Sequence, residues 1–488
     1  MRWLDLTVIL LYLVGITWFG ARFRHSQKTL KDYFLGGRNT PWWAIGFSIV
    51  SAETSTLTVI GTPALAFGAG GNLGFLQVVL GYLLARVVIS LLFLPHYFRG
   101  EMFTAYELMQ KRFGTRIRRL TAGSFLVLRA LAEGVRVFAI SIVVAIILDT
   151  GVLASILLIV GLTLFYTFEG GMTAVIWTDV IQMFLYVAGA VLSFFVILDR
   201  IPGGWQHVVE VASEAGKFQV FDFRFAWSMD FFSRTFNFWA GLIGGCLLTT
   251  ASHGTEQLMV QRLLAARSLK EGRRALLASW VVIFFQFTLF LLIGVILFVY
   301  YQDTRLDPPK PADRIYPAFI WTHLPAGVAG LVMAAILAAA MSNLSAALNA
   351  LASTTVMDFY KPLEERRRRP RSEAEYLKLA RRMTLLWGVI LFGVGWVSRE
   401  VDSVLQAGLS IASVIYGSLL GVFLLGVLTR RVGETAAMAG MVTGLLVMLY
   451  VRLATPIAWT WYVLIGSTVT FCVGWLAALV APGEEAHG

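Results

Sequence analysis

The sequence has little charge. Charged residues make up 14% of its 488 residues, whereas a soluble domain carries about a quarter. Hydrophobic residues account for 58% of the chain, and the mean hydropathy is +0.73. This composition excludes a soluble globular protein. It predicts an all-α polytopic protein whose main partner is the lipid bilayer, because helices satisfy their own backbone groups inside a membrane.

Cysteines and acidic residues are also scarce. The two cysteines, Cys246 and Cys472, lie in apolar stretches, so we expect neither a disulfide framework nor a cysteine metal site. Basic residues outnumber acidic ones by 40 to 29, but they gather between hydrophobic stretches, and we expect no nucleic-acid partner. Metal-ligand clusters and nucleophile–base pairs do not stand out, so we expect neither an enzyme nor an organic cofactor.

Hydrophobic runs long enough to span a bilayer, roughly 20 residues each, occur about thirteen times. They cover residues 4–21, 42–69, 73–98, 118–148, 152–168, 173–198, 235–264, 275–302, 325–357, 378–398, 402–428, 434–452 and 459–481. The basic residues between them gather in 22–38, 99–119, 262–274, 361–371 and 430–431. With thirteen spans these loops share one side, which the positive-inside rule makes cytoplasmic. We therefore expect an outside N-terminus, a cytoplasmic C-terminus and residence in the inner (plasma) membrane.

The stretch from Trp42 to Gly70 is long enough to span a bilayer, yet its middle is polar. That middle contains Ser51, Glu53, Thr54, Ser55, Thr56 and Thr58, followed by Gly61 and Pro63. A carboxylate and hydroxyls at mid-depth must face protein or a water-filled cavity, and a proline cannot continue an intact hydrogen-bond ladder. We predict a broken second span whose freed carbonyls hold a small cation. The alternative is a kinked helix with hydroxyls bonded to its own backbone.

The seventh predicted span, 235–264, carries a similar interruption. The segment ASHGTEQ places Ser252, His253, Gly254 and Glu256 inside an otherwise apolar stretch. The two interrupted spans open two sets of five, spans two to six and seven to eleven, which start on opposite sides. This predicts an inverted repeat with a site between its halves at mid-membrane. The chain then divides into a first span with its inner loop (1–41), a first repeat (42–198), an outer loop (199–233), a second repeat (234–428) and two C-terminal spans (429–488).

The ninth predicted span supplies oxygen ligands. The segment GLVMAAILAAAMSNLSAALNALAS combines small residues, which permit close helix contact, with Ser342, Asn343, Ser345 and Asn349. Hydroxyl, amide and carbonyl oxygens suit a hard cation without a redox role, and Na⁺ fits better than a transition metal. The alternative is that these polar groups only join helices to one another.

Ionisable residues in other spans are further candidates. Asp179 can ligate a second cation, carry a proton or pair with a donor at a helix end. Arg129 and Glu133 are four residues apart and can pair with each other. Arg136 either binds a substrate carboxylate bidentately or neutralises Glu53. Arg86 is a further ionisable candidate, and His253, beside Gly254, is a structural hydrogen bonder in preference to a proton carrier. The remaining polar residues, which can line a cavity or join helices, are Gln77, Gln406, Ser410, Ser413 and Tyr416.

Five segments together resemble the sodium:solute symporter family. They are SAETSTLTVIGTPA, TAYELMQKRFG, GGMTAVIWTDVIQ, GTEQLMVQR and AAAMSNLSAALNALASTTVMDFY, spread in this order over nearly the whole chain. The resemblance implies a LeuT-type fold of five plus five helices, with an additional first helix and extra C-terminal helices. It also implies alternating access driven by the sodium gradient. The family includes carriers of sugars, proline, pantothenate, iodide, monocarboxylates and sialic acid.

The resemblance also implies ligand sets. The principal sodium site would use the carbonyls of Ser51, Thr54 and Ala339 and the hydroxyl of Ser342, with Asn343 where the family usually has a second serine. A second sodium site, found in some members, would use Asp179 and Ser345, but the next ligand position is Ala346 here. The substrate positions would be Glu53, Ser55, Thr58, Gln77 and Arg136, with Ser252, Gln406 and Ser410 on spans seven and eleven.

We therefore expect a sodium-coupled symporter that imports a small polar solute. Arg136 favours a carboxylate and Glu53 favours an amine, which suggests an amino acid, an organic acid or an acidic sugar. One alternative is a proton-coupled carrier of the same fold, given Glu53 and Asp179. Another is a transporter-like sensor, which would append a signalling domain, whereas only residues 482–488 follow the last predicted span. We expect no obligate protein partner.

Overall fold

The computed structural model describes residues 2–22, 38–99, 105–166, 172–367 and 372–480. These residues are mostly helical, and among them the only β-type pairing is an isolated bridge between Thr40 and Ala266. The prediction of an all-α chain is confirmed. The predicted basic loops 22–38, 99–119 and 361–371 fall partly outside the described residues.

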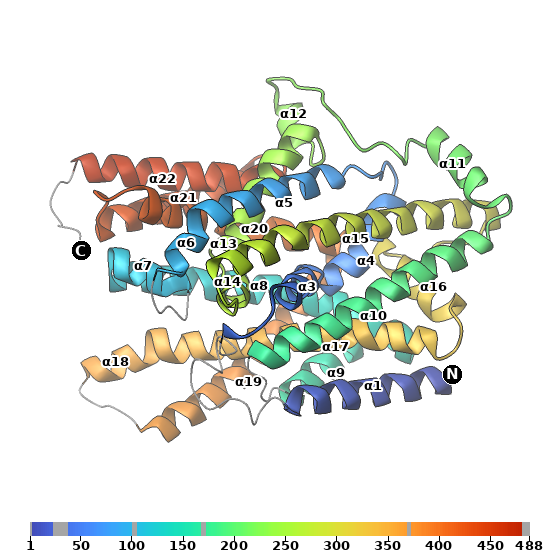
Figure 1. The fold of residues 1–488 in the computed structure, drawn as a ribbon, viewed down its shortest axis with the longest axis horizontal. Helices are drawn as coiled ribbons and strands as arrows, with labels where there is room; N and C mark the ends of the chain where they lie inside the picture. Colours follow the sequence, from blue (N-terminus) through green and yellow to red (C-terminus); the bar gives the residue numbers. More distant parts are fainter. Residues whose placement is uncertain (1, 23–37, 100–104, 167–171, 368–371, 481–488) are drawn as a thin grey trace.

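The helices form an elongated bundle in which most of them run along the long axis (Figure 1). The first half contains α1 (Trp3–Ala21), α3 (Trp42–Glu53), α4 (Thr56–Phe67), α5 (Leu76–Val88), η3 (Ile89–Phe93), α6 (Leu94–Tyr97), α7 (Ala105–Phe113), α8 (Thr115–Leu148), α9 (Val152–Tyr166), α10 (Met172–Asp199) and α11 (Gly204–Glu214). The second half begins with α12 (Met229–Ser233), η4 (Ala240–Gly244), α13 (Gly245–Gly254), α14 (Gln257–Leu264), α15 (Leu269–Thr304), η5 (Ala312–Arg314) and α16 (Ile315–His323). It ends with α17 (Val328–Thr354), η6 (Thr355–Tyr360), α18 (Lys361–Arg366), α19 (Glu373–Val397), η7 (Ser398–Glu400), α20 (Val404–Leu428), α21 (Glu434–Ala454), η8 (Trp459–Trp461) and α22 (Tyr462–Val480).

Many of these helices have the length and apolarity of membrane spans. In the described part of the chain nine helical stretches are long and apolar enough to cross a membrane, or ten if the bent pair α3–α4 is one span. The helices α1 and α9 are apolar but shorter, and the predicted seventh span is divided among η4, α13 and α14. The number of thirteen crossings stays a prediction.

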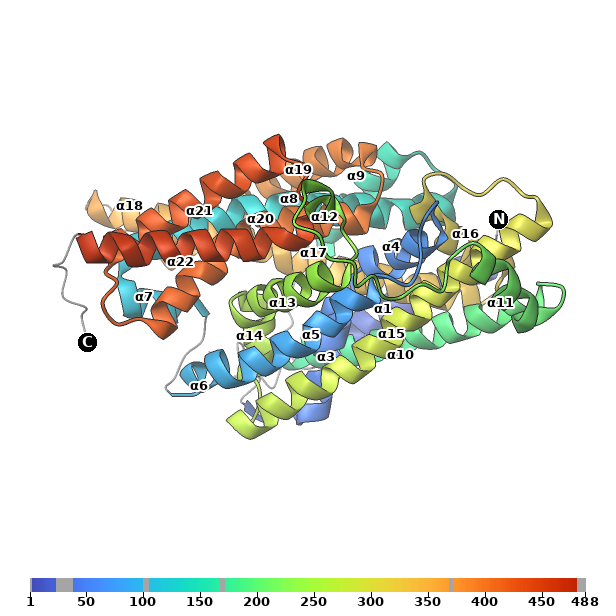
Figure 2. The same cartoon turned by 90° about the horizontal axis from the view of Figure 1, so that it is seen from above.

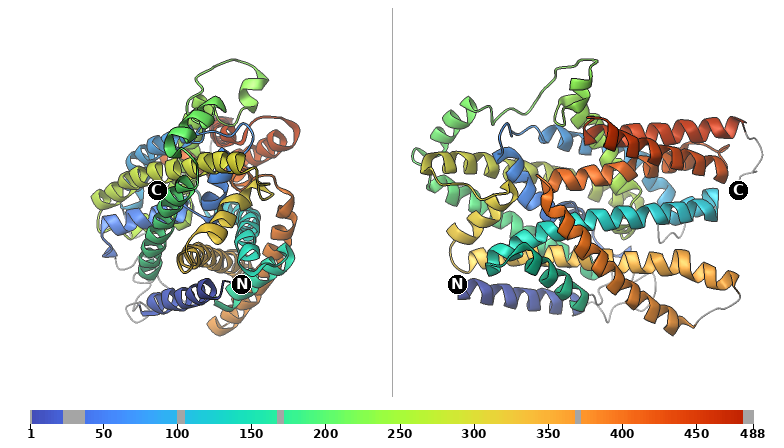
Figure 3. Two further views of the ribbon diagram at one scale, coloured as in Figure 1. Left: turned by 90° about the vertical axis from the view of Figure 1, so that its right-hand side faces the viewer. Right: turned by 180° about the vertical axis from the view of Figure 1, so that it is seen from behind.

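Different helices lie at the two ends of the bundle. α11 lies at one end of the long axis, and α7 and α18 lie at the other (Figure 1 and, from behind, Figure 3). We refer to these as the α11 end and the α7 end. α1 begins toward the α11 end, whereas α22 ends toward the α7 end (Figure 1). The predicted outer loop (199–233) contains α11 and α12.

The chain leaves helical geometry at Thr54 and Ser55, where α3 and α4 meet at an angle of 61°. Gly61 and Pro63, which we expected to cause this interruption, lie inside α4, so that part of the prediction is wrong. Proline removes one backbone hydrogen bond but does not by itself end a helix whose neighbours hold it. The break falls instead where polar side chains bond to other helices: Glu53 to α5, and Thr54 to α15.

A second discontinuity separates α13 from α14. α13 ends at Gly254, and Thr255 and Glu256 connect it to α14. Seen from above, α13 lies between α5 and α20 (Figure 2), and it packs against both helices. α17 packs against α1, α4, α8 and α10. These contacts bring both discontinuities, α8 and α20 around one space inside the bundle.

Candidate functional site

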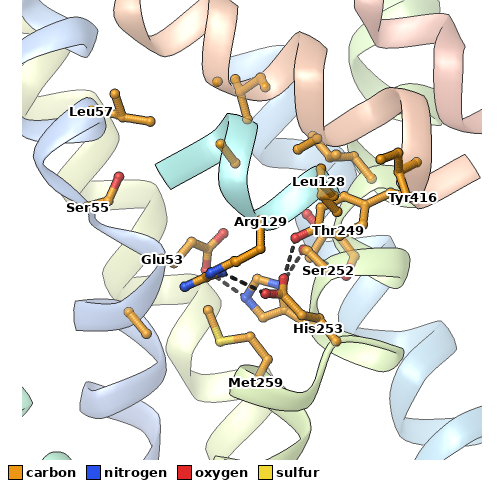
Figure 4. Close-up of a pocket in the computed structure, with 18 of the residues that line it drawn as sticks. Glu53, Ser55, Leu57, Leu128, Arg129, Thr249, Ser252, His253, Met259 and Tyr416 are labelled. Carbon is orange, nitrogen blue, oxygen red and sulfur yellow. Dashed lines mark hydrogen bonds and ion pairs between the residues drawn. The ribbon is translucent and has the colours of Figure 1, made fainter. Parts of the chain in front are cut away.

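A cavity of about 150 Å³ lies between the α3–α4 break, α8, α13 and α20. Its lining includes five of the eight residues that we predicted to bind substrate, namely Glu53, Ser55, Thr58, Arg136 and Ser252. The close-up shows side chains from these four elements converging on one space (Figure 4). Tyr416, another predicted cavity residue, also lines it.

The cavity is covered toward the α11 end. There α4 and α20 approach so closely that a Cβ atom added to Gly61 would lie 2.7 Å from the Cβ of Leu405. A Cβ added to Gly408 would lie 2.8 Å from Leu57. In the other direction the lining continues to Tyr106 of α7. The structure therefore has a cavity that is shut at the α11 end and extends toward the α7 end.

The break in α3–α4 releases two backbone carbonyls beside this cavity. In an α-helix the N–H of Ser55 would bond to the carbonyl of Ser51, and the N–H of Thr58 to that of Thr54. Here the N–H of Ser55 donates to the carbonyl of Glu53 at 3.1 Å, and the N–H of Thr58 donates to that of Ser55 at 2.8 Å. The carbonyls of Ser51 and Thr54 thus lose their helical partners, which is what a cation site made from an unwound helix requires.

Glu53 is held by two basic residues from different helices. Its Oε2 atom lies 2.5 Å from Nη2 of Arg86 on α5 and 3.3 Å from Nε2 of His253 on α13. The other ring nitrogen of His253 is 2.8 Å from the hydroxyl of Ser252, and Figure 4 shows these side chains facing one another. The alternative in which Arg136 neutralises Glu53 is therefore wrong, because Arg86 occupies that position.

A second group of charges lines the cavity on the α8 side. Arg129 pairs with Glu133, as the four-residue spacing predicted, and with Glu256, each at 2.9 Å. Glu133 also pairs with Arg136 through the same oxygen, Oε1. Tyr416 donates a hydrogen bond to Glu256. Within the described part of the chain, Oε2 of Glu133 and the Nε atoms of Arg129 and Arg136 are buried without a hydrogen-bond partner, so this group retains one unused acceptor and two unused donors.

Asp179 lies outside the cavity lining and is paired with an arginine. Its Oδ2 atom accepts a hydrogen bond from Ser48 at 2.6 Å and lies 3.0 Å from Nη2 of Arg262 on α14. Arg262 also donates to the Ser48 hydroxyl. A cation at Asp179 would therefore compete with the guanidinium of Arg262. This geometry matches the structural pairing that we named as one of three roles for Asp179.

The predicted sodium ligands come from two helices. Ser51 and Thr54 are buried at the break, and Ala339 is buried on α17. Ser342, Asn343 and Ser345 are half-buried on the same helix. α17 packs against both α4 and α10. α4 is the second half of the broken span, and α10 contains Asp179.

Three predicted substrate residues do not line the cavity. Gln406 and Ser410 lie on α20, but its lining face consists of Leu405, Gly408, Leu409, Ala412, Ile415, Tyr416 and Leu419. This face repeats every three or four residues and leaves Gln406 and Ser410 outside it. Gln77 is engaged elsewhere: its Oε1 atom accepts the N–H of Asp222, and its Nε2 atom donates to the carbonyl of Gly74.

Sequence reasoning missed two basic residues. We assigned Arg262 to a cytoplasmic basic loop, although it falls within the predicted seventh span, and its position inside that span was the available signal. Lys217 was not singled out at all. It is buried in the outer loop with only 2% of its surface exposed, and nothing in its mixed-charge neighbourhood marks it.

The helical bundle, and the cavity inside it that charged and apolar side chains line together, define an integral membrane transport protein. The model of the sodium:solute symporter family matches residues 33–444, most of the chain. The protein belongs to this family. Its relatives include the sodium/sialic acid symporter SiaT of Proteus mirabilis, 28% identical over 491 residues that cover 99% of this chain and 96% of the relative. The human sodium/iodide cotransporter is 30% identical over 460 residues, covering 92% and 69% of the two chains.

Solved structures agree with this assignment. A substrate-bound, outward-open Na⁺-coupled sialic acid symporter superimposes with a TM-score of 0.83 at 28% identity, covering 99% of both chains. The nucleobase-cation-symport-1 family transporter Mhp1, in a closed conformation, gives a TM-score of 0.54 at 11% identity over 92% and 95% of the chains, a likeness of fold alone. The protein is a sodium-coupled symporter of a small solute, as its sequence predicted.

Proposed function

We propose that the protein imports a small organic solute carrying a carboxylate, by alternating access between the α11 end and the α7 end. The main observation behind this proposal is the position of the cavity, which is lined by Glu53 and Ser55 of the α3–α4 break and by Arg136 of α8. An acidic sugar, an organic acid and an amino acid all have the required group. Two relatives are sodium/sialic acid symporters, which supports an acidic sugar as the first solute to test.

The contacts of Arg136 support its role in binding the carboxylate. Its side chain is 27% exposed and lines the cavity. One Nη atom is held by Glu133. Because Glu133 fixes one edge of the guanidinium and the side chain lines the cavity, the remaining N–H groups can donate to a carboxylate of the solute. Glu53 would then face an amine or hydroxyl of the solute across the cavity.

We propose that the principal sodium ion binds between α3 and α17. Its ligands would be the carbonyls of Ser51, Thr54 and Ala339, the hydroxyl of Ser342 and the amide oxygen of Asn343. The loss of helical partners at Ser51 and Thr54 supports this placement. Asp179 and Ser345 would contribute to a second ion site only after Asp179 exchanges Arg262 for the ion. We expect no organic cofactor and no obligate protein partner in the transport cycle.

We propose the following architecture for this cycle. Thirteen spans place the N-terminus outside and the C-terminus in the cytoplasm of a plasma membrane, so the α11 end faces outward. Residues 42–198 and 234–428 form the two inverted five-helix units, which the likeness to Mhp1 supports at the level of fold. Sodium binding would join α3 to α17 and complete the solute site, which gives positive coupling between the two ligands. The structure, closed at the α11 end, then corresponds to an inward-facing state.

Uptake into proteoliposomes tests this function. An inward sodium gradient should drive accumulation of sialic acid, of a monocarboxylate or of an amino acid, each measured separately. Replacing sodium with choline should abolish accumulation of the transported solute. Accumulation driven by a pH gradient in choline buffer would support the proton-coupled alternative. Sodium binding without uptake of any solute would support the sensor alternative.

A further inference from the structure

The outer loop is bonded to the inside of the bundle through a buried lysine. Lys217 follows α11, and its Nζ atom donates to the carbonyls of Ala66, Phe67 and Gly68 at 2.9, 3.0 and 2.7 Å. These are the last carbonyls of α4 and its C-cap, which lack partners within the helix. An ammonium has three donors, so Lys217 satisfies three acceptors at the end where the helix dipole is negative. The ring of Phe298 lies 4.3 Å from Nζ and covers it.

A few residues later the same loop bonds to α5. The backbone N–H of Asp222 donates to Oε1 of Gln77 at 3.0 Å, and the carbonyl of Asp222 accepts from the N–H of Phe238 at 2.9 Å. Gln77 is buried and packs against Gly241 of η4. The segment 217–223, which we call the strap, therefore connects the end of α4 to α5 and to the residues that lead into η4.

Aromatic rings reinforce this connection. Phe223 of the strap packs on Phe238, with ring centroids 4.7 Å apart, and stacks on Phe221 at 5.3 Å. Beneath the strap, Phe75, which precedes α5, packs against Phe236 and against Phe287 of α15. Phe75 and Phe287 also line the cavity. The strap thus lies over the aromatic layer that covers the cavity toward the α11 end.

We propose that the strap is a lid that holds the cavity closed at the α11 end, with Lys217 as the positioning residue that fixes α4 in the closed arrangement. α4 is the half-helix that contacts α20 through Gly61 and Leu405. Solute coming from the α11 end requires α4 to separate from α20, and this separation requires the lid to release α4. Release from Asp222 also frees the Oε1 atom of Gln77, which then becomes available to the solute.

The inference rests on the proposed function, because it takes from it that the α11 end faces outward. The structural part of it is tested without transport. In a chain with both native cysteines replaced by alanine, Leu409→Cys places a reporter in the cavity lining. Labelling by a membrane-impermeant maleimide, added outside intact cells in sodium-free choline buffer, then reports how often the cavity opens at the α11 end.

Two variants release the strap at different points. Lys217→Met removes the three donors to α4, and Gln77→Leu removes the acceptor on α5. Gln77→Leu should raise the labelling rate about fivefold, the shift in an equilibrium that accompanies the loss of one net hydrogen bond. Lys217→Met removes three charge-assisted bonds and should raise the rate by at least as much. Lys310→Met, an exposed lysine of another loop at this end, is the matched control and should label at the parent rate. If Lys217→Met does not reach the membrane, Gln77→Leu alone carries the test.

Sodium kinetics separate a positioning role from a folding defect. If the strap stabilises the closed state, Lys217→Met should lower the half-saturating external sodium concentration while the maximal uptake rate also falls. A folding defect lowers only the maximal rate. Unchanged labelling in both strap variants, or an equal rise in Lys310→Met, would overturn the proposal. Rapid external labelling of the parent reporter would instead overturn the proposed orientation, so the two failures are distinguishable.

Discussion

Glu53 and Arg86 form an ion pair at the break between α3 and α4, with Oε2 and Nη2 2.5 Å apart. Arg86 is completely buried and also donates to the hydroxyl of Ser279 and the carbonyl of Tyr82. The pair joins α3, α5 and α15 at the depth of the cavity. Because Glu53 also lines the cavity, one carboxylate serves both the packing of the bundle and the wall of the solute site.

Removal of either partner alone should therefore destabilise the protein strongly. Arg86→Met leaves the carboxylate of Glu53 with only His253 beside it, and the unpaired buried charge costs roughly 3–5 kcal/mol. The double variant Glu53→Gln, Arg86→Met removes both charges and should recover most of the loss. Thermal melting in detergent measures Arg86→Met, Glu53→Gln and the double variant. Equal melting temperatures for Arg86→Met and the double variant would show that the pair has no such role.

Ser342→Ala should weaken sodium dependence more than it weakens folding. The substitution removes one proposed oxygen ligand, and the half-saturating sodium concentration should rise about tenfold, as for the loss of one charge-assisted bond. Ser342 is half-buried on α17, so the melting temperature without sodium should change little. Thr354→Ala, on the same helix beyond the proposed site, is the control. A sodium dependence unchanged from the parent would remove Ser342 from the ion site.

Arg136→Ala should abolish transport of a carboxylate solute. The loss of one charged donor pair lowers uptake efficiency about 100-fold, measured as the initial rate at low solute concentration. Sodium binding, measured as sodium-induced thermal stabilisation, should persist, because Arg136 is not among the proposed ion ligands. Arg136→Lys keeps the charge but not the bidentate geometry and should be intermediate. Normal transport by Arg136→Ala would exclude it from the solute site.

Asp313 should make stability depend on pH. This residue lies in η5 at the α11 end, where Oδ2 accepts the N–H of Val404 at the start of α20 and Oδ1 is buried without a partner. Burial raises the pKa of Asp313 to about 6, so the folded protein binds a proton between about pH 4 and pH 6 that the unfolded chain does not bind. The stabilising contribution of Asp313 to the free energy of unfolding is fully present below pH 4 and is lost as the pH rises through about 6.

The raised pKa of Asp313 changes the free energy of unfolding by an amount on the order of 3 kcal/mol across this pH range. Lowering the pH from 7 to 5 should therefore raise the melting temperature, as far as Asp313 contributes. Asp313→Asn cannot titrate and should flatten the profile between pH 4 and pH 6 while it retains the hydrogen bond to Val404. The same slope in the parent and in Asp313→Asn would assign the pH dependence to other groups.

The sequence was sufficient for what depends on local pattern. The polar run beginning at Ser51 located the discontinuity of α3 and α4, because hydroxyls and a carboxylate at mid-depth need partners other than lipid. The four-residue spacing of Arg129 and Glu133 predicted their ion pair. By contrast, Pro63 was given too much weight, since a proline inside a packed helix is tolerated when neighbouring helices hold both sides.

Pairs between distant segments could not be predicted in the same way. Arg86 lies on α5 and Arg262 on α14, and only the three-dimensional arrangement of the helices shows that these arginines meet Glu53 and Asp179. Gln406 was chosen for its polarity, whereas the cavity face of α20 is mostly apolar and is set by the rotation of the helix. Lys217 donates hydrogen bonds to carbonyls in another part of the chain, and no sequence pattern in its loop predicts that contact.

Two close contacts between α4 and α20, of Gly61 with Leu405 and of Gly408 with Leu57, allow one state of the transport cycle to be trapped by substitution. α4 and α20 meet without a side chain on one partner at each point. A methyl group added at Gly61 or Gly408 would keep α4 and α20 apart. The protein would then favour the state in which its cavity is open at the α11 end. Such variants would present the solute pocket to inhibitors and antibodies in a single posture.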